Sequence, residues 1–474
     1  MPDHDYPYAF DRSHTAAEIR DRFGSLEPDS DAGERARVAG RVRTVRTHGK
    51  VAFADLEDGS GRLQLFAQQT VLGDDGMEAF SQLNVGDIVG AEGAIVMTRR
   101  GELSVRVEST TLLAKCLKPL PEKWHGMSDV EARHRHRYLD LLVNPETRQV
   151  LGARATANNE IRRFLDERGF IEVETPLLQP VASGAVARPF ITHLNALNMD
   201  LYLRVAPELY LKRLLVGGLE RVYELNRSFR NEGVSARHNP EFTMLEAYEA
   251  YVDYDTTMTL VEDLVRAIAR AVIGSETITA GDRTIELGPR FRRISMFDAI
   301  RETADLDLEE AWKRGDEEAL RSAAQDVGVQ ADETWPLGVL LAAIFESAAE
   351  RKLLQPTFVA GFPKDVSPLA KDHRGIDGFT EHADLVIGGV ELAPVYSELN
   401  DPVEQRRRFE QQARARERGA EEVALPDEDF LEALSYGMPP AGGFGLGIDR
   451  LLALLLGVGS IRDAILFPVL KPEQ

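Results

Sequence analysis

One segment of the chain combines residue types that could bind a phosphate, an aromatic base and a cation. It predicts a strand that ends at Arg230, a polar loop, and a second strand over Glu241–Tyr248. Side chains alternate between the two faces of a strand. One face of the second strand therefore carries four side chains: Phe242, Met244, Glu246 and Tyr248. Arg230 can face the same cleft, but a salt bridge packed over a core aromatic ring would use the same residues. This hairpin alone leaves both interpretations open.

A glycine-rich segment near the C-terminus could place an arginine beside a phosphate. Gly443–Gly447 lacks the GxGxxG spacing of dinucleotide-binding loops, and no GxxxxGK[ST] phosphate loop occurs in the 474 residues. Arg450 follows at the start of an apolar helix over 451–456. A helix start favours anions because its free N–H groups and dipole are positive, so this arginine suits a phosphate. A glycine-rich turn with a surface arginine is the simpler alternative.

The third segment is a predicted helix followed by a predicted strand. Apolar residues recur at helical spacing within Asn159–Arg168, and Gly169 ends the helix. Residues 170–175 have the pattern of a strand, which Pro176 terminates. This combination indicates packing rather than direct chemistry.

Composition and charge restrict the class of protein. Lys and Arg number 56 against 78 Asp and Glu, a formal net charge of −22, so a nucleic-acid partner would need a local basic patch. The single cysteine, Cys116, excludes an intrachain disulfide and fits a reducing cytoplasm. The N-terminal residues lack the apolar stretch of a secretory signal. The most apolar run, Leu451–Val458, is far shorter than the roughly 20 residues that span a bilayer, so we expect a cytoplasmic protein without a membrane partner.

The chain has two regions with different patterns of predicted secondary structure, and these regions must position the three segments. About five short alternating strands between Arg37 and Leu113 predict a small barrel of the OB kind. Lys118–Pro121 reads as a stiff linker, and helices alternate with strands beyond it. We therefore divide the chain into a lead-in, a barrel, a linker and a larger domain that holds the chemistry: residues 1–33, 34–115, 116–130 and 131–474.

Taken together and in this order, the three segments resemble the three signature motifs of class II aminoacyl-tRNA synthetases. The likeness to the lysyl-tRNA synthetases extends from about residue 35 to the C-terminus. It includes five further stretches: Ala187–Phe190, Leu203–Leu214, Asn226–Leu245, Ser397–Pro402 and Tyr436–Pro440.

The resemblance implies an α+β fold, with an N-terminal OB barrel for the anticodon and a catalytic domain built on an antiparallel sheet flanked by helices. It implies a lysine–tRNA ligase that forms lysyl-adenylate from L-lysine and ATP and transfers lysine to the 3′ end of tRNA(Lys). It also implies a homodimer and Mg²⁺, and no DNA partner is expected. The alternatives are an aspartyl- or asparaginyl-tRNA synthetase, a paralogue that ligates lysine to a non-tRNA acceptor, and a non-catalytic tRNA-binding protein.

In the barrel, the resemblance assigns Phe53 and Gln64 to the anticodon uridines, by stacking and by edge hydrogen bonds. Phe53 in the barrel core is the structural alternative. Basic residues nearby are expected to supply local positive potential: Arg35, Arg37, Arg41, Arg43, Arg46 and Lys50.

In the larger domain, the resemblance gives Arg230 and Arg450 catalytic roles on the phosphates, with Arg230 also bound to the lysine carboxylate. Phe242 would stack on adenine, and the remaining ATP contacts are Glu232, Arg237, His238 and Glu391. The metal positions are Asp384 and Glu391, and hard carboxylates favour Mg²⁺. The lysine contacts are Gly184 and Glu208 at the α-amino group, Arg230 at the carboxylate, and Glu246, Tyr248 and Glu398 at the ε-ammonium.

Three positions depart from the family pattern. Asp384 is shorter than the usual glutamate, Ser183 replaces a glycine, and Pro394 replaces an asparagine. The proline removes an amide and a backbone N–H, so lysine affinity is expected to differ from the family norm.

Overall fold

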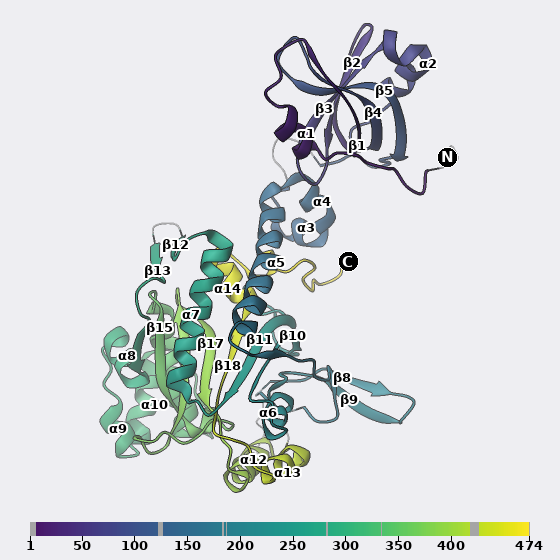
Figure 1. The fold of residues 1–474 in the computed structure, drawn as a ribbon. Helices are drawn as coiled ribbons and strands as arrows, with labels where there is room; N and C mark the ends of the chain where they lie inside the picture. The colour runs from purple at the N-terminus through teal and green to yellow at the C-terminus, as the bar shows by residue number, and fades with distance from the viewer. Residues whose placement is uncertain are drawn as a thin grey trace. The chain divides into compact units, whose positions relative to one another are not determined.

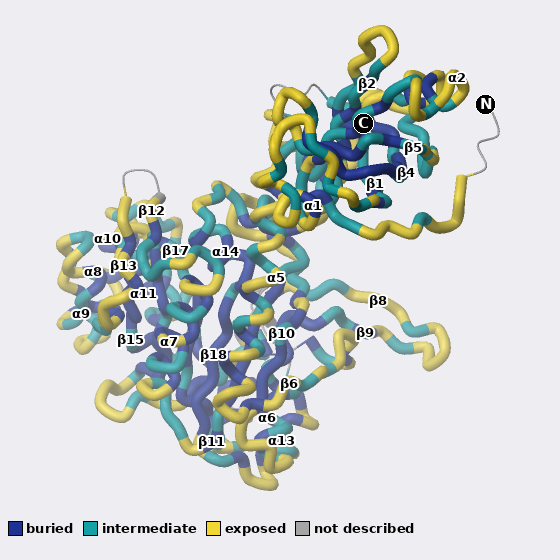
Figure 2. The backbone as a smooth tube through the Cα atoms, turned by 45° about the horizontal axis from the view of Figure 1, so that its top comes forward, coloured by how far each residue is buried: buried dark blue, intermediate teal, exposed yellow. Residues whose placement is uncertain are grey.

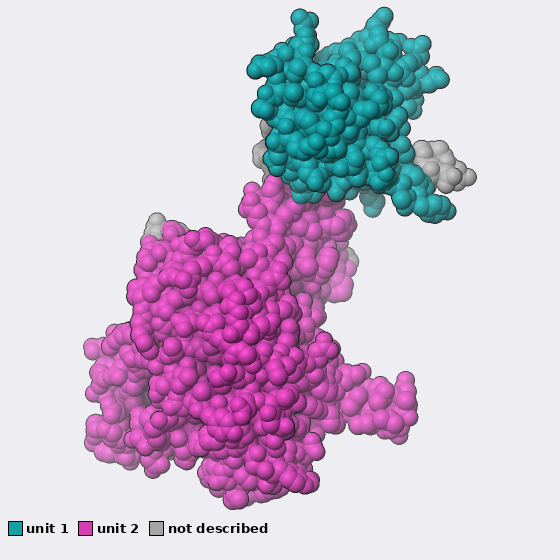
Figure 3. Space-filling model, in the orientation of Figure 1, with its two compact units in different colours: residues 1–128 teal, residues 129–474 magenta. Residues whose placement is uncertain are grey.

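The computed structural model of the chain describes residues 6–121, 127–182, 184–185, 187–280, 283–332, 334–417 and 426–473. The chain forms two compact units, residues 1–128 and 129–474 (Figure 3). Each unit has its own hydrophobic core. The two units are therefore treated one at a time.

The first unit is a five-stranded closed barrel, which confirms the OB fold (Figure 1). Its strands pair in the order β1-β2-β3-β5-β4. Their bounds are β1 (Ser30–His48), β2 (Val51–Glu57), β3 (Arg62–Gln68), β4 (Ile88–Met97) and β5 (Leu103–Ala114). Two helices accompany them: α1 (Ala16–Phe23) and α2 (Gln69–Ser81). In β2 and β3 every second residue is buried, so the alternating faces read from the sequence are the faces of the barrel wall.

The second unit is built on an eight-stranded sheet of order β14-β15-β16-β17-β18-β11-β10-β6. The strands from β15 to β10 are antiparallel to their neighbours, whereas the pairs at the two ends, β14–β15 and β10–β6, are parallel. Their bounds are β6 (Ile171–Glu172), β10 (Arg221–Phe229), β11 (Glu241–Ala250), β14 (Arg292–Ser295), β15 (Thr357–Pro363), β16 (Phe379–Ile387), β17 (Val390–Ser397) and β18 (Ala441–Gly447). The α+β class is confirmed.

Three helices cover one face of this sheet: α5 (Pro145–Asp166), α7 (Tyr254–Ile273) and α14 (Ile448–Leu455). Figure 1 shows α5 and α7 side by side, and Figure 2 shows the central strands beneath as buried. Side chains such as Phe164, Leu264 and Leu451 pack on Leu245 and Phe444 of the sheet in the largest apolar cluster. This packing leaves the opposite face of the sheet to form the site.

The predicted helix and strand of the third segment differ from the observed ones. The helix begins earlier, at Pro145, because proline fits the first turn of a helix, where its missing N–H has no intrahelical acceptor. The predicted strand over 170–175 shortens to Ile171–Glu172, which pairs with β10 alone at the edge of the sheet. A strand with one partner holds few ladder hydrogen bonds, so tertiary context ends it before Pro176.

Smaller elements complete the second unit. A three-stranded sheet comprises β7 (Leu178–Gln179), β8 (Ile191–Leu194) and β9 (Met199–Leu203), and β12 (Thr277–Ala280) pairs with β13 (Arg283–Glu286). The other helices are α3 (Val130–Arg135), α4 (Arg137–Val143), α6 (Glu208–Val216), α8 (Met296–Ala304), α9 (Glu309–Lys313), α10 (Glu317–Asp326), α11 (Leu337–Ala348), α12 (Pro402–Glu417), α13 (Glu428–Ser435) and α15 (Ile461–Ala464). Single 3₁₀ turns occupy Glu350–Lys352 and Lys364–Val366. Within the described part of the chain, none of these helices has the length and apolar character to cross a membrane.

Candidate active site

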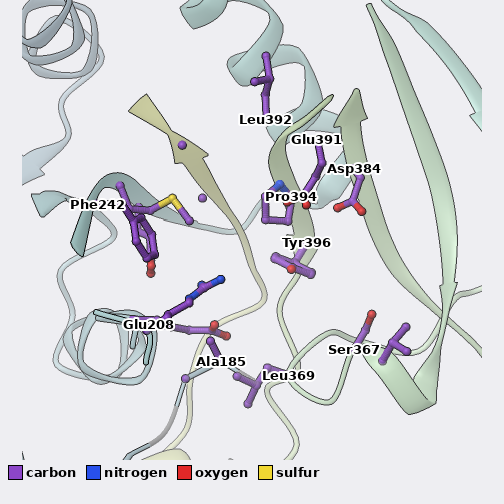
Figure 4. Close-up of a pocket in the computed structure, with 18 of the residues that line it drawn as sticks. Ala185, Glu208, Phe242, Ser367, Leu369, Asp384, Glu391, Leu392, Pro394 and Tyr396 are labelled. Carbon is purple, nitrogen blue, oxygen red and sulfur yellow. The ribbon is translucent and has the colours of Figure 1, made fainter. Parts of the chain in front are cut away.

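A cavity of about 480 Å³ lies on the face of the sheet opposite α5 and α7. Strands β11, β16, β17 and β18 form its floor, and α6 and α11 contribute to its walls. The four alternate side chains of β11 all line it: Phe242, Met244, Glu246 and Tyr248. Intervening residues such as Leu245 point into the apolar cluster on the other face. Figure 4 shows Phe242 and Glu208 on one side of the cavity, with Asp384, Pro394 and Tyr396 on the other.

Nearly all of the larger domain's predicted site residues meet in this cavity. Its lining includes Gly184, Glu208, Arg230, Glu232, Arg237, His238, Phe242, Glu246, Tyr248, Asp384, Glu391 and Arg450. Glu398 is the exception, because it is buried behind the wall. Ser183 lies outside the described residues.

Arg230 lines the cavity, and its charge helps to lower the pKa of both His238 and Glu246, so it lies near both groups. Its backbone N–H donates to the Pro240 carbonyl at 2.9 Å, and its guanidinium carbon lies 5.1 Å from the centre of the Phe242 ring. Its Nε is buried without a hydrogen-bond partner, and among the described residues no carboxylate forms an ion pair with it. A largely desolvated cation without a counter-ion is costly, so this arrangement fits an arginine that receives an anionic ligand.

Arg450 defines a positive end of the cavity. It stands in the first turn of α14, directly after β18. Its Nη1 donates to the Glu391 carbonyl at 2.9 Å and lies 3.4 Å from Glu391 Oε2, while its Nη2 lies 3.4 Å from His238 Nε2. Burial and the charge of Arg450 lower the pKa of His238, so this histidine is neutral near pH 7.

An acidic group lies beside this positive end. Asp384 on β16 and Glu391 on β17 point into the same part of the cavity (Figure 4). Burial raises the pKa of Asp384, and Glu391 adds to the rise, although His382 opposes it. Burial, with repulsion from Glu391, also raises the pKa of Glu350 to about 7 and raises that of Glu346 on α11. The result is an excess of negative charge that Arg450 compensates only in part.

Two further carboxylates that line the cavity, Glu208 and Glu246, form no ion pair with an arginine among the residues that the structure describes. Burial raises the pKa of Glu246 to about 8, and the neighbouring Glu208 contributes to the rise. The Tyr248 hydroxyl donates to Glu246 Oε2 at 3.2 Å. Gly184 has φ +93°, a conformation that favours glycine. A Cβ added at Gly184 would lie in van der Waals contact with the side chain of Glu208. This acidic end of the cavity is suited to a cationic group.

Gly443 on β18 has a steric role in this end. A Cβ there would lie 2.2 Å from Glu398 Oε1 and 2.6 Å from ring carbons of Tyr248. The glycine-rich segment is therefore a strand in which the absence of side chains makes room for the site. The same strand is followed directly by the helix that carries Arg450. Pro394, opposite Asp384 in the sheet, lines the cavity directly.

In the barrel, Phe53 lies on the half-buried outer face and not in the core. It stacks on Phe66 of β3, with ring centres 5.1 Å apart and planes within 7° of parallel. Gln64 is two residues before Phe66 on the same strand face and accepts a hydrogen bond from Ser104 Oγ at 3.1 Å. Two aromatic rings and an amide thus share one surface that could read unpaired bases.

The basic residues of β1 are largely neutralised. Arg46 lies 3.3 Å from Asp55, Arg43 lies 3.3 Å from Glu57, and carboxylates also pair with Arg35 and Arg37. The expected local positive potential is therefore weaker than a count of arginines indicates, because nearby carboxylates screen it.

Comparison with protein families places this geometry in context. The model of tRNA synthetases class II (D, K and N) matches residues 129–471, and that of the OB-fold nucleic acid binding domain matches residues 36–113. The chain belongs to the class II tRNA synthetase family.

Relatives of this synthetase extend the match over nearly its whole length. A lysine–tRNA ligase of Moorella thermoacetica is 50% identical over 471 residues, covering 99% of this chain and 94% of the relative. Those of Syntrophomonas wolfei and Thermosynechococcus vestitus are also 50% identical, covering 98% and 99% of this chain and 93% of each relative. The synthetase is thus a member of the family that these ligases form.

Several residues of the synthetase site were not identified from its sequence. Ser367, His382 and Tyr396 line the cavity, as does Glu346. His382 lies 2.8 Å from Asp384 Oδ1 and 2.7 Å from Ser367 Oγ, between the rings of Phe362 and Tyr396. Period two along β17 could have identified Tyr396, because it lies between Pro394 and Glu398 on one strand face. The same period along β16 could have identified His382, which lies two residues before Asp384. No local pattern marks Ser367 and Glu346, which the packing of distant segments brings into the site.

Proposed function

We propose that this protein is a lysine–tRNA ligase, which activates L-lysine with ATP and transfers it to the 3′ end of tRNA(Lys). The observation that carries the proposal is the order of charge along the cavity. Arg450 marks a cationic end, Arg230 stands unpaired in the middle, and Glu208 and Glu246 mark an acidic end. That order complements ATP phosphates, a substrate carboxylate and a substrate ammonium. An aspartyl enzyme would need a cation where these carboxylates stand, and the neutral amide of asparagine would leave their charge uncompensated.

The resemblance to the lysyl-tRNA synthetases supplies the proposed residue roles, and the shared lining of one cavity supports them. Arg230 binds the lysine carboxylate and the ATP α-phosphate together, and Phe242 stacks on adenine. Glu232 contacts the adenine side, while the distal phosphates are bound by Arg237, His238 and Arg450. Gly184 and Glu208 receive the lysine α-amino group. The ε-ammonium is received by Glu246, Tyr248 and Glu398, with Glu398 acting from behind the wall.

The reaction is an in-line attack of the lysine carboxylate on the α-phosphorus, which expels pyrophosphate. A tRNA ribose hydroxyl then attacks the carbonyl carbon of the adenylate, which forms the ester and releases AMP. Neither step needs a covalent nucleophile from the protein. Arg230 neutralises charge that develops on the transferring phosphorus, and the acidic end holds lysine in line. Catalysis therefore rests on positioning and electrostatic stabilisation.

The acidic group beside Arg450 fits Mg²⁺ that arrives with ATP. Asp384 and Glu391 supply hard carboxylate oxygens, and burial, with repulsion from Glu391, raises the pKa of both Asp384 and Glu350. Among the described residues no three side chains form a complete ligand set. Mg²⁺ commonly takes one or two carboxylates and completes its shell with phosphate oxygens and water. Bound there, the ion would neutralise phosphate charge.

The proposal is tested by ATP–pyrophosphate exchange with each of the twenty amino acids, followed by charging of tRNA. Lysine should give the highest exchange, and tRNA(Lys) should accept it. A preference for aspartate or asparagine would overturn the proposal. Exchange with lysine but no charging of any tRNA would favour a paralogue that ligates lysine to another acceptor.

The homodimer is proposed on exposed apolar surface around β6 and β7. Ile171, Leu177 and Leu178 are 50%, 46% and 46% exposed and lie close together in sequence. Burial of such a patch against a second copy would remove apolar surface from water. Light scattering should give the mass of two chains, and a monomer at micromolar concentration would contradict this.

The single Cys116 fits a reducing compartment, so we propose the cytoplasm.

Substitution of Phe53 by alanine should impair tRNA charging but not lysine activation. Loss of one base-stacking contact costs about 1–3 kcal/mol, so kcat/KM for tRNA should fall about 5- to 150-fold. Lysine-dependent pyrophosphate exchange should stay within about two-fold, because the barrel takes no part in it. Val71→Ala, an exposed apolar truncation on α2, is the control. Unchanged charging, or equal losses in both assays, would refute the anticodon role of Phe53.

Lysine binding should release protons between pH 6 and 8. In the free protein the raised pKa of Glu246, about 8, keeps this carboxyl protonated below that pH. Pairing with an ammonium requires the ionised form, so binding expels protons, and the KM for lysine should fall as pH rises through this window. Calorimetry in buffers of different ionisation enthalpy measures the release.

Two comparisons make the proton measurement specific. Neutral norleucine should bind without release, and Glu246→Gln should reduce the release seen with lysine. A lysine-binding enthalpy independent of the buffer would show that the Glu246 carboxyl is already ionised.

A further inference from the structure

Lys212 is a fully buried cation beside the acidic end of the cavity. It lies on α6, and its side chain is 0% exposed. Its Nζ donates to Glu208 Oε1 at 2.7 Å, lies 2.5 Å from Glu398 Oε2 and lies 3.4 Å from the Leu369 carbonyl. Burial by itself lowers the pKa of Lys212, but the two carboxylates more than offset this and hold it raised. The ammonium is therefore charged and bridges two carboxylates.

Each of these carboxylates has a second oxygen that Lys212 does not contact. Glu398 is 1% exposed, and its Oε1 is buried without a hydrogen-bond partner, beside Gly443 and Tyr248. Glu208 lines the cavity, and no described residue donates a hydrogen bond to its Oε2. A buried carboxylate oxygen without a donor is costly, so Glu398 Oε1 points to a ligand cation that completes it. Lys212 thus fixes one oxygen of each carboxylate and leaves the other available.

The formal charges at this end also balance for one kind of substrate. Glu208, Glu246 and Glu398 supply three negative charges, whereas Lys212 and Arg230 supply two positive ones. One negative charge remains when all are ionised. An amino acid with two ammonium groups and one carboxylate carries one positive charge and neutralises it. Without Lys212, buried like charges would be left in excess.

This inference rests on the proposed lysine activity and extends it. We infer that Lys212 is a positioning and specificity-determining residue, an internal counter-cation that holds Glu208 and Glu398 and leaves one negative charge for a monocationic substrate side chain. Lys212 acts through these carboxylates and does not contact the reacting atoms.

The decisive experiment compares Lys212→Met, Glu398→Gln and the double variant in pyrophosphate exchange. Lys212→Met should raise the KM for lysine at least about 10-fold, because both carboxylates lose the group that holds them, while the KM for ATP changes less than about two-fold. In Glu398→Gln, Lys212 is paired with Glu208 alone. Lys212 then competes with the substrate α-ammonium for the Glu208 carboxylate. Removal of Lys212 from that variant restores the charge balance. The double variant should therefore exceed Glu398→Gln in kcat/KM for lysine by about five-fold or more.

Controls separate this role from a general contribution to stability. Lys115→Met removes another lysine ion pair, with the buried Asp87 in the barrel, and should leave the KM for lysine unchanged. Thermal unfolding of each variant reports stability separately. If Lys212→Met alone does not fold, the double variant, which lacks both buried charges, still tests the rescue.

Two results would overturn the inference: folded Lys212→Met with a KM for lysine within two-fold of the wild type, or a double variant no better than Glu398→Gln. Wild-type exchange that prefers another amino acid would instead refute the proposed function, so the two failures are distinguishable.

Discussion

Substitution of Arg230 by alanine is expected to reduce lysine-dependent pyrophosphate exchange at least about 1000-fold with the fold intact. The reason is that its guanidinium stands over the Phe242 ring with a buried, unpaired Nε and no carboxylate partner among the described residues. No native ion pair is lost in the free protein, so the effect should fall on the bound phosphate and carboxylate. Arg230→Ala should even retain full thermal stability, because it removes an uncompensated charge.

A matched control exists on the same sheet. Arg293 also lies over a phenylalanine, 5.9 Å from the centre of the Phe358 ring, but it pairs with Asp255 at 3.2 Å and is absent from the cavity lining. Arg293→Ala should lower stability slightly and leave exchange near normal. Exchange within ten-fold of the wild type in folded Arg230→Ala would remove Arg230 from the proposed chemistry.

Substitution of Arg450 by alanine is expected to lower kcat/KM for ATP about 100-fold or more, with a smaller change in the KM for lysine. Arg450 stands at the positive start of α14 and lies 3.4 Å from Glu391 Oε2. Its removal takes charge from the phosphates and leaves the acidic group of Asp384, Glu391 and Glu350 less compensated. The measurement is exchange as a function of ATP concentration at saturating lysine.

Arg450→Lys separates charge from geometry. A lysine keeps the positive charge but lacks the planar fork that holds the Glu391 carbonyl, so its activity should lie between wild type and Arg450→Ala. If Arg450→Ala lowers kcat/KM for lysine as strongly as for ATP, the separation of the cavity into a phosphate end and an amino-acid end is wrong.

Local patterns in the sequence were sufficient for the elements that carry the site. The alternation of Phe242, Met244, Glu246 and Tyr248 predicts one strand face, and those side chains line the cavity. The barrel and the helix that carries Arg450 in its first turn were likewise predicted. These features depend on the period of a strand or helix and on helix-start chemistry, which operate over a few residues and so can be read from a short stretch of chain.

Tertiary structure alone decided which side chains act on one another. Lys212 meets Glu398, and Gly443 makes room for Tyr248, only because β11, β17, β18 and α6 pack together. The length of β6 was decided in the same way, by a single pairing with β10. The sequence predicted Glu398 as an acidic residue near the substrate. It did not show that a buried lysine neutralises this residue. The pairing of charges depends on burial and on contacts between distant segments, and neither is encoded in local spacing.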